Sequence, residues 1–373
     1  MLSNFMNTSA MPNGKCGIRA LLLAMLLLVV APAHAVEIDD LYSAEVPVDP
    51  NDSDSRETAY ERALQQVLIR VTGSEDAAFS PELKALFPNP ARYVLQYRPG
   101  EGNSLWVMLD GAAIEDVLRR ASMPVWGNDR PLTVLWIAVD WGLGERELLL
   151  AAPAQNARKP AGTVDRAQSL RDRIQRVARA RGVPVVFPTL AADDDRISFS
   201  DVWGGFHERL MDASRAYGSS SILVGRLRAD AVERNRWSYY VGTQQRQWAG
   251  EAEDAIHLLA DSLAGEFAFA GNAGIETVSL SIANVGSAGA FAAVQGLVDG
   301  LDMVAAYTVT EVSGNQIRYS IDINGGARRL AAVLDLRAEL ARATVSPLNS
   351  GAAPVRSTAT LFYDYRPATR GME

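Results

Sequence analysis

The stretch that decides how the chain is organised is SMPVWGNDRPLTVLWIAVD, residues 122–140. Pro124 and Pro131 disfavour a helical conformation at the residue before each of them, and the Gly-Asn pair between them tolerates a positive φ. Residues 132–139 are almost continuously apolar, which is typical of a strand covered on both faces. The chain is therefore expected to turn here and continue as a buried strand, so the stretch is either a junction between two folded modules or an active-site loop.

The polar residues of this stretch favour the junction. A catalytic loop normally offers His, Ser, Cys or several carboxylates. The polar side chains offered here are Asn128, Asp129, Arg130 and Asp140. We therefore expect Trp126 and Trp136 to pack at the junction, where the last helix of the first module meets the first strand of the second.

The residues before the junction predict a small module over residues 36–126. An alternating strand at 42–48 and a helix with one apolar stripe at 56–72 come first. Two strand-like runs, ARYVLQY and SLWVMLD, and a helix at 114–120 follow. The order β-α-β-β-α predicts an antiparallel sheet with helices on one face.

The residues after the junction alternate helix and strand. Helices at 164–181 and 201–217 each lead through a glycine into an apolar run, VPVVFP and SILVGRL. A polar hairpin and a helix at 254–267 close the segment. This pattern predicts an α/β sandwich with a mixed, largely parallel sheet over residues 127–270.

The last part of the chain repeats the plan of the first. TVSLSIANV predicts a strand, 288–298 a helix, AAYTVTEV and QIRYSIDI a hairpin, and 327–340 a second helix. The sequence thus predicts a ferredoxin-like β-α-β-β-α module over residues 275–345, and a tail, 346–373, whose TLFYDY run could add a last strand. The chain as a whole is expected to combine α+β and α/β modules.

Residues 1–35 have the pattern of a secretory signal peptide. Lys15 and Arg19 precede the apolar run ALLLAMLLLVV, and APAHA supplies the small residues of a cleavage site after Ala35. The run is shorter than the ~20 apolar residues that span a bilayer, so a retained membrane anchor is the less favoured alternative. We expect a periplasmic protein, with peripheral contact to an envelope membrane as a further possibility.

Composition excludes several kinds of chemistry. Cys16, the only cysteine, lies before the apolar run, so the mature chain would have no disulfide, thiolate nucleophile or cysteine-bound zinc. With the signal removed, 34 basic and 44 acidic residues remain, a net charge of about −10. Sequence-independent nucleic-acid binding needs a cationic surface, so no nucleic-acid partner is expected.

The segment from Leu41 to Asp140 resembles a known family. The runs LYSAEVPV, ERALQQVLIRVTG, LWVMLD and VLRRASMPVWGNDRPLTVLWIAVD are similar to domain-of-unknown-function family 2066, an exported proteobacterial family. That resemblance implies an envelope location and assigns no catalytic residues. In plan, SRAYGSSSILVGRLRAD followed by RWSYYVGTQQRQWAG is similar to the α/β domains of the TolB N-terminal type and of peptidoglycan-synthase activators.

Motifs for catalysis and for cofactors are absent from the sequence. After the signal, His207 and His257 are the only histidines, and no His-Glu-x-x-His, P-loop or G-x-S-x-G pattern is present. We expect no catalytic residue, no cofactor and no metal. A general-base role would reopen if the two histidines met in space.

The helix at 164–181 is rich in arginine. Arg166, Arg173 and Arg176 are expected on its exposed side, opposite an apolar stripe. Such a charge run is usually a solvated face, and the alternative is a docking surface for an anionic partner.

Three classes of function remain open at this point. The favoured one is a non-catalytic binding or assembly module of the cell envelope, with envelope proteins or glycan as partners. A glycan hydrolase that uses only two carboxylates is the second. The third is a scaffold that associates with copies of itself.

Overall fold

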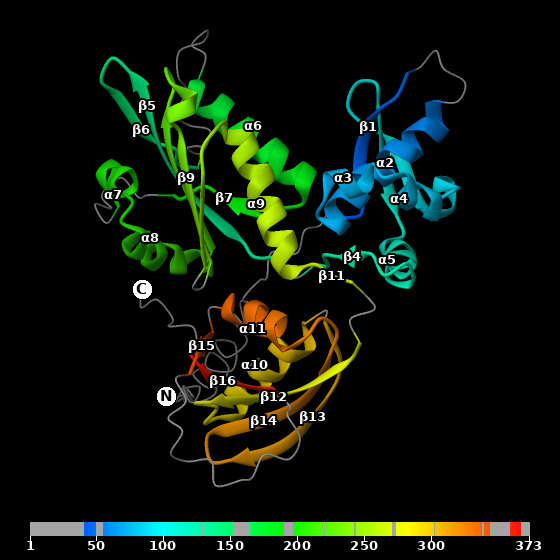
Figure 1. The fold of residues 1–373 in the computed structure, drawn as a ribbon, viewed down its shortest axis with the longest axis vertical. Coiled ribbons are helices and arrows are strands. Elements are labelled where there is room, and N and C mark those ends of the chain that lie inside the picture. Colours follow the sequence, from blue (N-terminus) through cyan, green and yellow to red (C-terminus); the bar gives the residue numbers. More distant parts are fainter. Residues whose placement is uncertain are drawn as a thin grey trace, which may run out of the picture. The chain divides into compact units, whose positions relative to one another are not determined.

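The computed structural model describes residues 41–49, 55–128, 130–151, 165–189, 197–219, 221–241, 244–270, 274–301, 303–337, 339–343 and 359–366. Within these ranges helices pack on antiparallel and mixed sheets, an α+β fold as the sequence predicts (Figure 1). The predicted signal peptide and its cleavage site after Ala35 lie outside the described residues.

The N-terminal part, residues 43–120, is an antiparallel sheet with helices. Its elements are β1 (Ser43–Pro47), α2 (Ser55–Thr72), α3 (Glu75–Ala78), α4 (Pro81–Leu86), β2 (Val94–Pro99), β3 (Ser104–Leu109) and α5 (Gly111–Arg120). The strand order is β1-β3-β2. The apolar stripe of α2 is fully buried against the inner residues of β3, Val107 and Leu109. Helices α3 and α4 lie between α2 and β2, and α5 follows β3.

The central part, residues 133–267, is built on a mixed sheet. Its strands are β5 (Thr133–Gly142), β6 (Glu145–Leu148), β7 (Val185–Val186), β8 (Ser221–Arg228), β9 (Arg236–Val241) and β10 (Gln244–Trp248). Their order is β10-β9-β8-β5-β6, and β7 also pairs with β5. Only the β5–β8 and β5–β7 pairings are parallel, so the sheet is less parallel than the sequence suggests.

Helices cover both faces of the central sheet. Helices α6 (Arg166–Arg181) and α9 (Ala252–Phe267) share one core with every second residue of β5, while α7 (Phe199–Gly204) and α8 (His207–Ser214) share another core with the residues between (Figure 1). The single helix expected at 201–217 is thus two helices. Gly205 ends α7 in a left-handed conformation with φ +72°, which breaks the helical path.

The C-terminal part, residues 276–365, has one strand more than predicted, besides the last strand expected from TLFYDY. Its elements are β12 (Glu276–Ala283), α10 (Ala288–Asp299), β13 (Val304–Ser313), β14 (Gln316–Ile323), α11 (Ala327–Asp335), β15 (Leu340–Arg342) and β16 (Thr360–Tyr365). The strand order is β13-β14-β12-β16-β15. TLFYDY forms β16, which pairs parallel with β12 and antiparallel with β15. The expected helix at 327–340 ends early because Leu340 pairs with Tyr365 in the sheet.

A short ribbon connects the parts of the chain. Strand β4 (Pro124–Val125) pairs with β11 (Phe269–Ala270), so the segments that lead into and out of the central part lie side by side. Backbone hydrogen bonding also links Trp126 N–H to the carbonyl of Val71 in α2 at 2.7 Å. Backbone hydrogen bonds therefore hold residues 124–126 of the junction in place.

Candidate binding pocket

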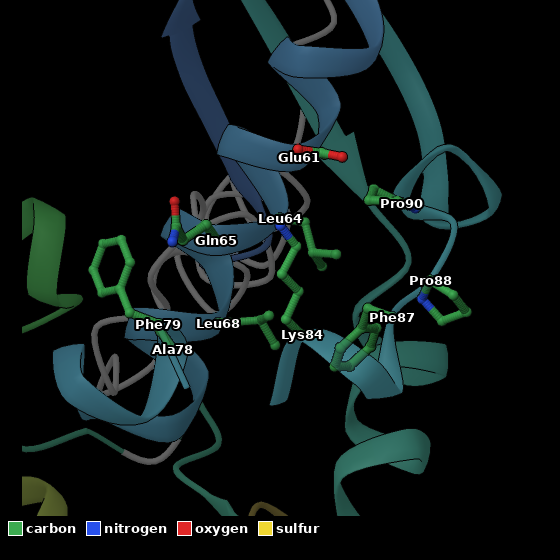
Figure 2. A pocket seen from close by; sticks show the side chains of 10 residues that line it. All are labelled: Glu61, Leu64, Gln65, Leu68, Ala78, Phe79, Lys84, Phe87, Pro88 and Pro90. Atoms are coloured by element: carbon green, nitrogen blue, oxygen red, sulfur yellow. The ribbon is translucent and has the colours of Figure 1, made fainter. Parts of the chain in front are cut away.

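A pocket opens beside helix α2 in the N-terminal part (Figure 2). Its volume is about 180 Å³. Helix α2 forms one side of the pocket. The segment from Ala78, at the end of α3, through α4 to Pro90 forms the other side. The lining residues are Glu61, Leu64, Gln65, Leu68, Ala78, Phe79, Lys84, Phe87, Pro88 and Pro90.

Helix-capping serines and prolines determine the path of the chain beside this pocket. Ser74 and Ser80 cap α3 and α4, because their hydroxyls accept the backbone N–H of Ala77 and Leu83 at 3.1 Å each. Pro81 occupies the first turn of α4, Pro88 follows the end of that helix, and Pro90 begins a short 3-10 helix, Pro90–Tyr93. Helix α3, helix α4 and the turn after Phe87 thus form the side of the pocket that faces α2.

The pocket has an apolar base and a charged rim. Leu64, Leu68 and Phe87 are buried, with 4, 3 and 4% of their surface exposed, and form the base. The rim carries Glu61 and Lys84, which are exposed and have no ion pair with a described residue.

Phe79 is the most unusual side chain at the pocket. It is 62% exposed although it directly follows α3, whereas Ala78 before it is buried. A large aromatic ring that stays in water next to an apolar hollow is typical of a protein-binding surface. The periodicity of the sequence could not identify it, because only the three-dimensional path of residues 73–90 brings it to α2.

The lining groups can bind but offer no catalytic arrangement. They comprise one carboxylate, one ammonium group and one amide, with no nucleophile next to a base. The volume is also below the ~300–1,000 Å³ of typical small-molecule sites. The pocket therefore suits one apolar side chain of a partner, with charged groups around it.

The arginine face expected on α6 is partly neutralised. Arg166 forms an ion pair with Glu145, and Arg173 pairs with Glu253 at 3.3 Å. Arg176 is exposed and has no ion pair with a described residue. These contacts support the solvated-face interpretation for two of the three arginines.

The two tryptophans expected at the junction lie in different cores. Trp126 is 1% exposed and packs in the core with Leu135 and Ile137, near the end of α2. Trp136 lies on the other face of β5, where its Nε1–H donates to the hydroxyl of Ser214 at 2.8 Å. Trp136 does not pack with Trp126, because Leu135 and Ile137, its neighbours in β5, point to the opposite face of the sheet.

Arg130 is the residue of the junction that sequence reasoning passed over. It is 6% exposed, and its guanidinium donates to the carbonyls of Arg70, Trp126, Gly127 and Gly182 at 2.7 to 2.9 Å. The same group lies 4.1 Å above the Trp126 ring. Burial lowers the pKa of Arg130. Its position beside a proline in a turn, where backbone carbonyls lack helix or sheet partners, is the signal that could have indicated it.

The two histidines do not meet. His207 belongs to α8 and stacks on Tyr240 with 4.8 Å between ring centroids. His257 belongs to α9, where its Nδ1 lies 3.0 Å from an Nη of Arg181. Since α8 and α9 cover opposite faces of the central sheet, no shared general-base site forms from them.

The described residues hold neither a candidate metal cluster nor a candidate membrane-spanning helix. They contain no group of three or more His, Cys, Asp and Glu that could hold a metal ion. They also contain no helix that is both long and apolar enough to cross a membrane.

Comparison with known proteins gives one match. Residues 35–127 match the model of a family described as a domain of unknown function, DUF8605. No curated protein and no solved structure matches the chain. The expected family 2066 and the TolB-type similarity of the middle region stay predictions. The matched segment contains every residue that lines the pocket, so the pocket belongs to a segment similar to DUF8605.

Proposed function

We propose that this protein is an exported, non-catalytic binding or assembly protein of the cell envelope, and that the pocket beside α2 holds a side chain of a protein partner. The observation that carries the proposal is an apolar hollow next to the 62% exposed ring of Phe79. Buried apolar anchors surrounded by polar groups account for most of the binding free energy of protein interfaces.

The rim restricts the kind of partner. Glu61 and Lys84 are exposed and free of ion pairs with described residues, and they line the same pocket. A partner segment with one apolar anchor between an acidic and a basic residue would complement both charges. Such complementarity mainly sets specificity and the rate of association.

The proposed location depends on the sequence of residues 1–35. A basic start, a short apolar run and the small residues before Ala35 support export and cleavage. N-terminal sequencing of the purified protein should then begin at Val36, and an intact N-terminus on protein from the cytoplasm would contradict export.

One observation bears on the alternative of a carboxylate-dependent hydrolase. Glu266 and Asp335 line a common pocket, and burial raises the pKa of Glu266. However, four arginines line that pocket as well, and glycoside hydrolysis passes through an oxocarbenium-like, positively charged transition state. Cationic walls would destabilise this state, so the binding function is favoured.

Site-specific photo-crosslinking in intact cells tests the binding function. A photoreactive phenylalanine analogue replaces Phe79 in one strain and Ala85 in a control strain, since Ala85 is exposed on α4 but does not line the pocket. We expect one envelope protein to be captured from position 79 only, and the capture to be lost when Lys84→Glu is added.

The outcomes distinguish the three classes of function. Capture of a second copy of this chain from position 79 would favour the self-associating scaffold. Equal capture from both positions, or capture that Lys84→Glu leaves unchanged, would contradict a role for the pocket.

A further inference from the structure

A second pocket, of about 340 Å³, lies between the central and C-terminal parts. Its walls come from the β9–β10 hairpin, the end of α9, helix α11 and strand β15. The described residues that line it include four guanidinium groups and two carboxylates. They are Val241, Gln244, Arg246, Gly265, Glu266, Arg328, Arg329, Ala332, Asp335 and Arg342.

One of the carboxylates is already neutralised within the protein. Asp335 forms an ion pair with Arg342 at 2.9 Å and accepts a hydrogen bond from the hydroxyl of Tyr363 at 2.7 Å. Once Asp335 and Arg342 are counted as a pair, the remaining charged groups of the pocket are Arg246, Arg328, Arg329 and the carboxylate of Glu266. None of these three arginines has an ion pair with a described residue.

Glu266 can balance at most one of the three arginines. Its carboxylate accepts a hydrogen bond from the side-chain amide of Gln244 at 2.8 Å. Burial raises the pKa of Glu266, which means that the surroundings disfavour its charged form. The pocket thus keeps an excess of positive charge.

The arginines of α11 are held in an unfavourable place for cations. Arg328 and Arg329 lie in the first turn of α11, where the helix dipole repels positive charge. The Nε of Arg329 donates to the backbone carbonyl of Glu266 at 3.3 Å, which fixes the guanidinium at the pocket wall. Burial and the neighbouring charge of Arg328 lower the pKa of Arg329. A bound anion would relieve both effects.

We propose that this pocket binds a phosphate group of a small phosphate ester through Arg246, Arg328 and Arg329. Guanidinium groups form paired, charge-assisted hydrogen bonds with phosphate oxygens, and several of them are needed to balance a doubly charged group. The volume reaches the lower end of the ~300–1,000 Å³ range of small-molecule sites, so an organic group fits beside the phosphate.

The phosphate group can belong to a soluble phosphate ester or to the headgroup of an anionic lipid. Two binding assays distinguish these sources. The purified protein is titrated with inorganic pyrophosphate in a calorimeter. In parallel it is mixed with vesicles of phosphatidylcholine, with and without phosphatidic acid, and separated by flotation. Binding of pyrophosphate alone indicates a soluble ligand, and co-flotation that needs phosphatidic acid indicates a lipid.

Three variants connect binding to the pocket. Arg246→Gln and Arg328→Gln each remove one cation, and we expect either one to weaken the observed binding by at least ~10-fold, the loss of one charge-assisted contact. Arg234→Gln is the matched control, because Arg234 is exposed, does not line the pocket and has no ion pair with a described residue. Circular dichroism verifies that each variant is folded.

Two results would overturn the proposal. The first is the absence of binding to pyrophosphate and to both kinds of vesicle. The second is binding that all three variants weaken equally, which would assign it to the general charge of the surface. Neither result depends on the partner pocket beside α2, so the two proposals fail separately.

Discussion

Two arginine side chains donate hydrogen bonds to backbone carbonyls at the C-terminal ends of α2 and α6. Arg181, the last residue of α6, donates from Nη2 to the carbonyl of Gly73, just beyond the end of α2, at 2.9 Å. Arg130 donates from Nη1 to the carbonyl of Gly182, which caps α6, at 2.7 Å. Carbonyls at a helix C-terminus lack intrahelical donors and carry partial negative charge, so both guanidinium groups stabilise these ends.

Single glycines show how closely the backbone is packed. Gly225 of β8 lies opposite Trp237 of β9, and an added Cβ would be 2.6 Å from the Trp237 ring. Trp237 itself is fully buried, and its Nε1–H donates to the carbonyl of Gly250 at 3.1 Å. The ring thus uses the space that a side chain at position 225 would need.

Gly225→Ala should therefore destabilise the protein. Overpacking of this kind typically lowers the free energy of unfolding by about 1–3 kcal/mol, measured by urea denaturation. The matched control is Gly296→Ala in α10, where an added Cβ meets no described atom within 4 Å. That change should instead raise the free energy of unfolding by about 0.5–1 kcal/mol, since alanine loses less conformational entropy in a helix. Changes of the same sign in both variants would contradict this account of position 225.

Helix α7 begins with several polar contacts. Ser198 and Asp201 form a capping box, in which the Asp201 carboxylate accepts the backbone N–H of Ser198 at 2.8 Å and its hydroxyl at 2.6 Å. Arg209 of α8 adds an ion pair with Asp201 at 2.5 Å. The hydrogen bonds from Ser198 lower the pKa of Asp201 below its usual 3.8.

A pH-dependent loss of stability follows for this capping box. Because the folded state lowers the pKa of Asp201, the folded protein holds fewer protons there than the unfolded chain at acidic pH. Its contribution is complete above pH 3.8 and is lost as the pH falls through the lowered pKa. Asp201→Asn should thus lower the free energy of unfolding by about 1 kcal/mol at neutral pH, and the difference from the natural protein should shrink in acid.

Urea denaturation at a series of pH values measures this difference. Asp212→Asn is the control, because Asp212 pairs with Arg215 while both side chains are mostly exposed, and such pairs contribute little. A difference that stays constant down to the lowest pH would mean that Asp201 contributes through packing and not through charge.

Much of this element structure could be predicted from sequence. The apolar stripes of α2 and α6, each followed by a glycine, set those helices, and the alternation of Ile317, Tyr319 and Ile321 set β14. The sequence-based prediction was wrong where tertiary contacts determine the secondary structure. Leu340 fits the helical pattern of the sequence, but it pairs with β16 as part of strand β15. Neither pocket could be predicted, since Arg246 and Arg328 are 82 positions apart in the sequence and no periodicity connects them.

At the scale of the molecule, the N-terminal and central parts share buried contacts. Gly73, with φ +70°, lies so close to α9 that an added Cβ would be 2.2 Å from the Cβ of Ala264. Arg181, 1% exposed, reaches from α6 to Gly73 and also contacts Asp261 of α9 at 2.5 Å. The buried side chain of Arg181 thus links α6 and α9, which pack on the central sheet, to the end of α2, which packs on the N-terminal sheet.

These shared contacts predict that the two parts unfold together. Far-UV circular dichroism reports all helices, and tryptophan fluorescence reports the seven tryptophans, of which Trp126, Trp136 and Trp237 are each at most 1% exposed. In urea, both signals should change in one coincident transition, the mark of cooperative unfolding. Two separated transitions in the natural protein would contradict the link.

Arg181→Gln tests which contacts produce the cooperativity. The shorter amide cannot reach Gly73 and Asp261 together, and each lost hydrogen bond of a charged group typically costs about 1.5–3 kcal/mol. We expect a lower urea midpoint and a separation of the two signals, because the N-terminal part keeps its own core while its attachment weakens. Arg179→Gln is the matched control, since Arg179 is exposed on the same helix and its Nε donates only to the carbonyl of Gln175, one turn before it. If both variants unfold in one transition at the same midpoint, the cooperativity must come from the apolar contacts of α2 with α6 and from the ribbon of β4 and β11.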